Sequence, residues 1–152
     1  MKNLILTTLL SSFLISSSAF AEKIVADLRS VDLAIASVQL TDTGTLKVQI
    51  RDGALETIQL TKANADEMLY RAQIVGDAEL VTDVHPVRCM IAIHPFSIQT
   101  LQIVDSKTGE LKTVLSHSSC AMGTFTHPKE EYQMTAAQQL KSELMVLARQ
   151  LE

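Results

Sequence analysis

Residues 45–51, with the sequence TLKVQIR, alternate strictly between apolar and polar side chains. This period of two is typical of a β-strand that buries one face and leaves the other in water. The segments TDTG (41–44) and RDG (51–53) lie on either side, and glycine supplies the positive φ angles that hairpin turns need. The pattern therefore predicts an antiparallel meander with residues 45–51 as its middle strand.

The other two strands of this meander follow from the same alternation. Residues 55–60, LETIQL, are the predicted third strand. In residues 32–40, DLAIASVQL, the apolar side chains fall on odd positions up to Ile35 and on even positions from Val38. A bulge or bend near Ser37 would bring both sets onto one face of the sheet.

Three further strands are expected in the second half of the chain. Residues 87–93, VRCMIAI, have the composition of a well-buried strand. Residues 98–104 and 110–116 form a predicted hairpin through the turn DSKTG, which pairs residue 104 with about residue 110. The sheet is therefore expected to have about six strands in two hairpin or meander units.

A short helix is predicted near residues 65–75. Asn64 and Glu67 have the spacing of a capping box, and Gly76 is placed where a helix often ends. Five apolar residues then share one helical face, which we interpret as core packing. They are Ala65, Met68, Leu69, Ala72 and Val75.

A long C-terminal helix is predicted over about residues 129–151. Pro128 suits a first helical turn, and Glu130 and Glu131 stand where the helix dipole favours negative charge. Its apolar stripe is predicted to pack on one face of the sheet and comprises Tyr132, Ala136, Leu140, Leu144, Leu147 and Leu151. The sequence therefore predicts an α+β fold: an antiparallel sheet with a short helix and a long C-terminal helix packed on it.

Residues 1–21 have the features of a secretory signal peptide. Lys2 precedes an apolar run of about a dozen residues, and a serine run and the tripeptide AFA follow it. The run is shorter than the roughly 20 residues of a membrane span. We therefore expect an exported protein, periplasmic or secreted, whose residues 22–152 form a single α+β domain.

The charge and the aromatic content of residues 22–152 disfavour several classes of ligand. Loss of Lys2 alone changes the net charge from −4 to −5, and no basic run is present. Binding to nucleic acid or to an anionic membrane is therefore not expected. The aromatic residues after position 21 are few for a base-stacking or sugar-stacking surface: Tyr70, Phe96, Phe125 and Tyr132.

The two cysteines, Cys89 and Cys120, are most simply explained as one disulfide bond of an exported domain. The bond would close a loop of about 30 residues and stabilise the fold by on the order of 3–4 kcal/mol in the chain-entropy model.

Every proline in the chain follows a histidine, and two of these pairs bound the segment HPVRCMIAIHP (85–95). A residue before proline is biased towards extended geometry, so the pairs can simply mark element boundaries. The alternative is a functional surface where loops leave a rigid sheet. Its predicted residues are His94, Pro95, Phe96 and His117.

A metal site is a second alternative for the histidines. The expected hairpin would bring His94 and His117 to the same end of the sheet, and His127 before the last helix could join them. Two or three imidazoles suit Zn or Cu, but no acidic residue is nearby in the sequence to complete the set. We therefore assign neither a metal nor another cofactor.

The motifs of common enzyme classes are missing from this sequence, and we expect that the protein is not an enzyme. There is no G-x-S-x-G, H-E-x-x-H, G-x-G-x-x-G or C-x-x-C segment. The favoured interpretation is a small exported binding module that acts on another protein as an inhibitor, adaptor or assembly component. The alternatives are a metal-binding protein or metalloenzyme using His94, His117 and His127, and a cell-envelope structural protein without a ligand.

Overall fold

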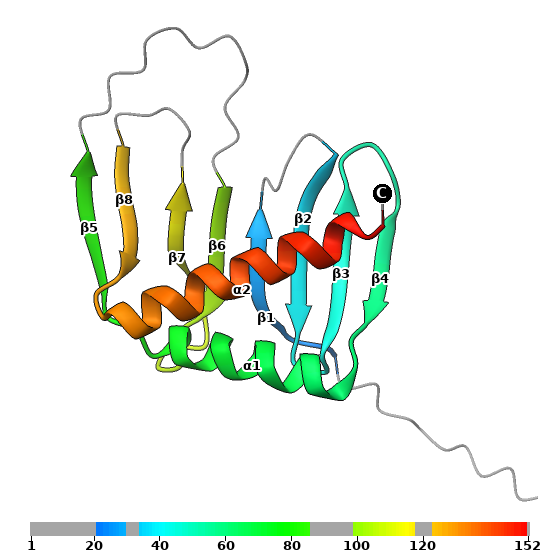
Figure 1. The fold of residues 1–152 in the computed structure, drawn as a ribbon, viewed down its shortest axis with the longest axis horizontal. Coiled ribbons are helices and arrows are strands. Elements are labelled where there is room, and N and C mark those ends of the chain that lie inside the picture. Colours follow the sequence, from blue (N-terminus) through cyan, green and yellow to red (C-terminus); the bar gives the residue numbers. More distant parts are fainter. Residues whose placement is uncertain (1–20, 30–33, 86–98, 118–122, 152) are drawn as a thin grey trace, which may run out of the picture.

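The computed structural model describes residues 21–29, 34–85, 99–117 and 123–151, which form one layer of strands and one layer of two helices (Figure 1). The strands are β1 (Ile24–Arg29), β2 (Ile35–Thr41), β3 (Thr45–Ile50), β4 (Leu55–Gln59), β5 (Leu80–His85), β6 (Gln99–Val104), β7 (Leu111–His117) and β8 (Gly123–Pro128). The helices are α1 (Lys62–Gly76) and α2 (Glu131–Arg149).

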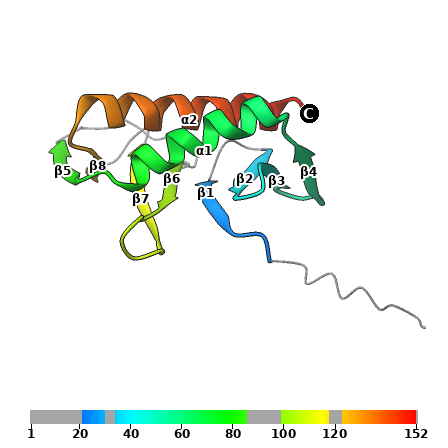
Figure 2. The same cartoon turned by 90° about the horizontal axis from the view of Figure 1, so that it is seen from below.

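Six strands form an antiparallel sheet in the order β4-β3-β2-β1-β6-β7, and β5 and β8 form a separate antiparallel pair. In Figure 1, β8 lies beside β7, so the pair extends the same layer. Figure 2 shows both helices on one face of that layer. The predicted α+β fold, with a short helix and a C-terminal helix on a six-stranded sheet, is confirmed.

The set of strands differs from the predicted one. The central strand β1 was not expected, and neither was the β5–β8 pair. The predicted strand at residues 87–93 lies outside the described residues. The other predicted strands appear as β2, β3, β4, β6 and β7.

The registers agree closely with the sequence pattern. Between Ile35 and Ser37 the pairing of β2 with β3 shifts by one residue, which confirms the predicted bulge. In the β6–β7 hairpin Val104 pairs with Leu111, one position from the predicted partner. A bulge moves the apolar residues of β2 onto one face, so the meander contributes a continuous apolar surface.

The hydrophobic core lies between the sheet and the two helices. The sheet contributes Ala26, Leu28, Ile35, Val38, Leu40, Leu46, Val48, Leu101, Ile103, Val114 and Leu115, and the rest come from α1, α2 and Leu60 before α1. Because alternate residues of a strand point to opposite faces, all these strands present their other side chains away from the helices.

Helix α1 begins earlier than predicted. The hydroxyl of Thr61 accepts a hydrogen bond from the backbone N–H of Asn64 at 3.3 Å, so Thr61 and not Asn64 is the N-cap. Gly76 is the last helical residue, and Asp77 is the C-cap. The predicted core stripe holds for Ala65, Met68, Ala72 and Val75, which are buried, while Leu69 is half-buried.

Helix α2 begins later than predicted, because Pro128 is the last residue of β8 and Glu130 is the N-cap. Tyr132 and Leu151, at the two ends of the predicted stripe, are exposed. The buried residues of α2 are instead Gln133, Ala136, Ala137, Leu140, Leu144 and Ala148. Neither α1 nor α2, the helices of the described part of the chain, has the length and hydropathy of a membrane span.

The C-terminal end of α1 approaches the β6–β7 hairpin closely. A Cβ atom at Gly76 would lie 2.7 Å from the carbonyl oxygen of Val104, which is shorter than any normal contact. Lys112 Nζ donates hydrogen bonds to the carbonyl oxygens of Gly76 at 2.8 Å and Ala78 at 3.1 Å, and it pairs with Asp105 at 2.8 Å. A cation at a helix C-terminus also suits the helix dipole.

Gly76→Ala is expected to lower the free energy of unfolding by about 1–3 kcal/mol, because the added methyl group overpacks the contact with Val104. Helix propensity alone predicts the opposite sign, since alanine is favoured over glycine by about 1 kcal/mol. Urea denaturation of both proteins decides between the two. Gly53→Ala is the control, because its Cβ would meet only side-chain atoms of Ile50, at 3.2 and 3.3 Å.

Candidate functional site

The predicted loop surface falls mostly outside the described residues. His94, Pro95 and Phe96, and both Cys89 and Cys120, belong to that part of the chain. His117 is the last residue of β7, and its backbone pairs with Gln99 of β6. Arg29, the last residue of β1, ends at the same side of the sheet in Figure 1.

His127 does not join His117. The strands β7 and β8 run in opposite directions side by side, so His127, near the end of β8, lies at the other end of the sheet (Figure 1). Among the residues that the structure describes, no group of three or more His, Cys, Asp or Glu side chains is placed to hold a metal ion. The expected proximity of these two histidines is therefore not found.

Both nitrogens of the His127 ring face hydrogen-bond acceptors. Nε2 lies 2.9 Å from Asp83 Oδ2, and Nδ1 lies 2.9 Å from the carbonyl oxygen of Pro128. Only the imidazolium form carries a proton on both nitrogens. The bond to Asp83, and then the bond to Pro128, raise the pKa of His127 above its ordinary value of 6.5. The site joins β5 to β8 and has no free nitrogen for a metal.

This arrangement makes stability depend on pH. The pKa of His127 is raised in the folded protein, so its two hydrogen bonds contribute fully to the stability of the fold below about pH 6.5. This contribution is lost as the pH rises through the pKa of His127 in the folded protein. Asp83→Asn is expected to lower the free energy of unfolding at pH 5.5, by less than about 1 kcal/mol because Asp83 is largely exposed. At pH 8.5 the loss should be smaller than at pH 5.5. Urea denaturation at both pH values measures the difference. An equal loss at the two pH values would contradict the role of the imidazolium.

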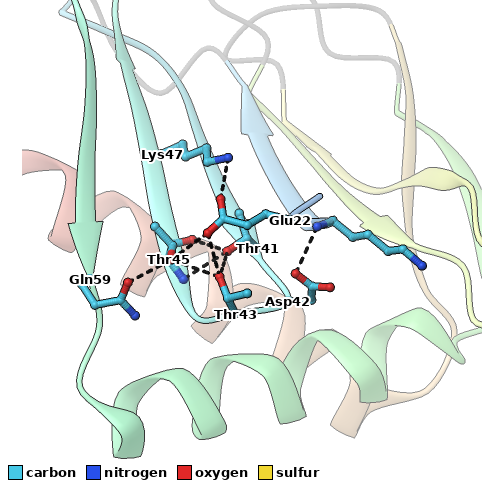
Figure 3. A network of polar contacts seen from close by, with 8 residues as sticks. Glu22, Thr41, Asp42, Thr43, Thr45, Lys47 and Gln59 are labelled. Carbon is cyan, nitrogen blue, oxygen red and sulfur yellow. Dashed lines mark hydrogen bonds and ion pairs between the residues drawn. The ribbon is translucent and has the colours of Figure 1, made fainter. Parts of the chain in front are cut away.

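A polar network fixes the residues before β1 to the β2–β3 turn (Figure 3). Glu22 accepts from Lys47 Nζ at 2.7 Å and from the hydroxyl of Thr43 at 3.0 Å, and both contacts lower the pKa of Glu22. Thr45 Oγ1 donates to Gln59 Oε1 at 3.0 Å, which extends the network to β4. Its acid and base partners are already paired with one another, which indicates a structural role.

A groove of about 250 Å³ lies between α1 and α2. Met68, Val146 and Leu147 form its apolar part, and Asn64, Glu67, Ser142 and Glu143 complete its lining. Arg71 bridges the helices beside it, with both carboxylate oxygens of Glu143 at 2.6 Å from Nη1. The groove is smaller than the roughly 300–1,000 Å³ of typical small-molecule sites, and its glutamates are held by Arg71.

The face of the sheet turned away from the helices is polar over most of its area. We call this surface the open sheet face, and define it by two rows of cross-strand partners on β3, β2, β1, β6 and β7. The first row is Gln49, Ser37, Arg29, Thr100 and Ser116, and the second is Lys47, Gln39, Asp27, Gln102 and Thr113. No described helix or strand covers this face (Figure 2).

Asp27 and Arg29 stand at the centre of the open sheet face. Arg29 Nε donates to Asp27 Oδ2 at 2.8 Å, and the Arg29 side chain is 57% exposed, whereas that of Asp27 is 1% exposed. The second oxygen of Asp27, Oδ1, is buried without a hydrogen-bond partner. A buried carboxylate with an unused oxygen is costly, so this pair is the most unusual polar feature of the described residues.

A pattern in the sequence predicts a strand that contains this pair. Residues 24–29, IVADLR, alternate between Ile24, Ala26 and Leu28 on one face and polar residues after Val25 on the other. This is the same period of two that identified β3. It would have placed Asp27 and Arg29 on a polar face, but not in the centre of the sheet.

Comparisons of this chain with family models, with curated proteins and with solved structures found no match.

Proposed function

We propose that this protein is a small exported binding module, periplasmic or secreted, that recognises another protein through its open sheet face. The observation that supports the proposal is a row of polar side chains across five adjacent strands, on a face that no described helix or strand covers, while both helices pack on the opposite face. The module would act without catalysis, as an inhibitor, adaptor or assembly component.

The dimensions and composition of the open sheet face suit a protein partner. Five strands at about 4.8 Å spacing and about 20 Å length give a footprint of roughly 20 by 20 Å, comparable with the central part of a standard interface of about 800 Å² per partner. Its glutamine, serine and threonine side chains are half-buried and uncharged. Such groups provide hydrogen bonds without the desolvation cost of many charges.

The proposal includes a disulfide bond between Cys89 and Cys120, which both lie outside the described residues. His85 pairs with Gly123 at the end of this two-stranded sheet. Cys89 follows His85 by four residues, and Cys120 precedes Gly123 by three.

The exported form is expected to begin at Glu22 and to be two hydrogens lighter than the reduced chain. Intact mass measurement of protein purified from the exported fraction, without reducing agent, tests both expectations. Cys89→Ala with Cys120→Ala should then lower the free energy of unfolding by about 3–4 kcal/mol in the chain-entropy model. A mass with two free thiols and a retained metal would instead support the metal-binding alternative.

Site-specific photo-crosslinking tests the binding surface. A photoreactive residue replaces Gln39 or Gln102 on the open sheet face, and the control replaces Gln138, an exposed glutamine of α2. In the cell that produces the protein, we expect one adduct of defined mass from both sheet positions and none from Gln138.

Two other outcomes would count against the proposal. An adduct from Gln138 alone would move the partner to the helical layer. A chain that crosslinks at none of the three positions, with its fold intact by circular dichroism, would favour the alternative of a structural protein without a ligand.

A further inference from the structure

We infer that Arg29, flanked by Ser37 and Thr100, is a docking site for a carboxylate on the open sheet face, supplied by an acidic segment of the protein partner. This inference deepens the proposed function and depends on it for the identity of the partner. The site itself is a property of the isolated protein and can be measured without the partner.

The three side chains lie on three adjacent strands at the same level of the sheet. Arg29 of β1 pairs in register with Ser37 of β2 and with Thr100 of β6. Directly opposite residues of antiparallel strands have Cβ atoms about 4.5–5.5 Å apart on the same face. Arg29 is therefore flanked on each neighbouring strand by one residue that carries a hydroxyl group.

Within the described residues, the guanidinium of Arg29 is oriented by one bond. Its Nε donates to Asp27, and neither terminal nitrogen has a hydrogen bond or ion pair with another described residue. The two terminal nitrogens carry four of the five N–H donors of an arginine side chain. This is the geometry that binds a carboxylate through two parallel hydrogen bonds.

Asp27 acts as a positioning residue for this site. Its carboxylate is almost fully buried and has no other partner, so it holds the Nε side of Arg29 and cannot itself reach a ligand. Because the Arg29 side chain is oriented before a ligand binds, less conformational entropy is lost on binding. The other charged residue in the two rows is Lys47, two strands away, and Glu22, which precedes β1, neutralises it.

The preference for a carboxylate follows from the neighbours of Arg29. The other members of its row are Ser37, Thr100, Gln49 and Ser116, which are all uncharged hydrogen-bonding groups. Because Asp27 already compensates the charge of Arg29, the remaining N–H donors and neutral neighbours match a ligand with at most a single negative charge. A phosphate ester with two charges would be compensated only in part.

The test is an NMR titration of the full mature chain with a capped hexaglutamate peptide. We expect saturable shifts of the Ser37 and Thr100 amides and of the Arg29 Nε–H signal. A hexaglutamine peptide of the same length should produce none of them. Arg29→Gln is expected to weaken binding at least about tenfold, the loss typical of hydrogen bonds to a charged group.

Three variants control for changes in folding and in total charge. Asp27→Asn with Arg29→Gln leaves no unpaired buried charge, and it should also lose binding. Arg29→Lys keeps the charge but not the planar fork, so binding should be intermediate. Arg149→Gln removes one guanidinium from exposed α2, and binding should not change.

The inference is overturned if no saturable shift occurs, or if Arg29→Gln binds the peptide as well as the unsubstituted chain. Inorganic phosphate is titrated in parallel, and binding about tenfold tighter than the peptide would reject the carboxylate assignment. A negative titration would not change the crosslinking expected at Gln39 and Gln102. The carboxylate site and the proposed binding surface can therefore fail independently.

Discussion

The pairing of β1 on both of its edges is the constraint on which the rest of the structure depends. On one side β1 pairs with β2 of the meander, and on the other with β6 of the second hairpin. Without it the six-stranded sheet would divide into two separate parts. Ala26 and Leu28 face the helices and are completely buried, while Asp27 and Arg29 face the opposite side. One strand of six residues therefore supplies both the middle of the core and the middle of the open sheet face.

The regular part of the fold could be predicted because its signals are local. The alternation in β3, the turn with positive φ at Gly44 and the bulge near Ser37 are each visible within about ten residues of sequence, and each appears in the structure, whereas Gly53 in the next turn does not have a positive φ. The strand order is different in kind. Ala26 pairs with Ile103, 77 residues away, and no local pattern can identify such a partner. The start of α1 was misplaced because Thr61 and Asn64 are both good capping residues, and Thr61 is the one that caps the helix.

The candidate site could be predicted much less well than the fold. Polar alternation can place Arg29 on an exposed face, but the burial of Asp27 beside it depends on neighbouring strands. Similarly, the partner of His127 is Asp83, 44 residues earlier in the chain. A search for histidines near one another in sequence could not find that contact. Chemistry that arises from pairing between distant strands becomes visible only when the order of the strands is known.

The topology of β1 also determines the order in which the sheet can form. The β2–β3–β4 meander and the β6–β7 hairpin are closed by short turns, so each can form early from nearby residues. The contact between β1 and β6 requires closure of a loop of more than 70 residues, as Leu28 and Leu101 show. A chain that emerges from its N-terminus therefore exposes its central strand first and completes that strand's pairing only after β6 has followed. The six-stranded sheet therefore stays incomplete until most of the chain has been synthesised.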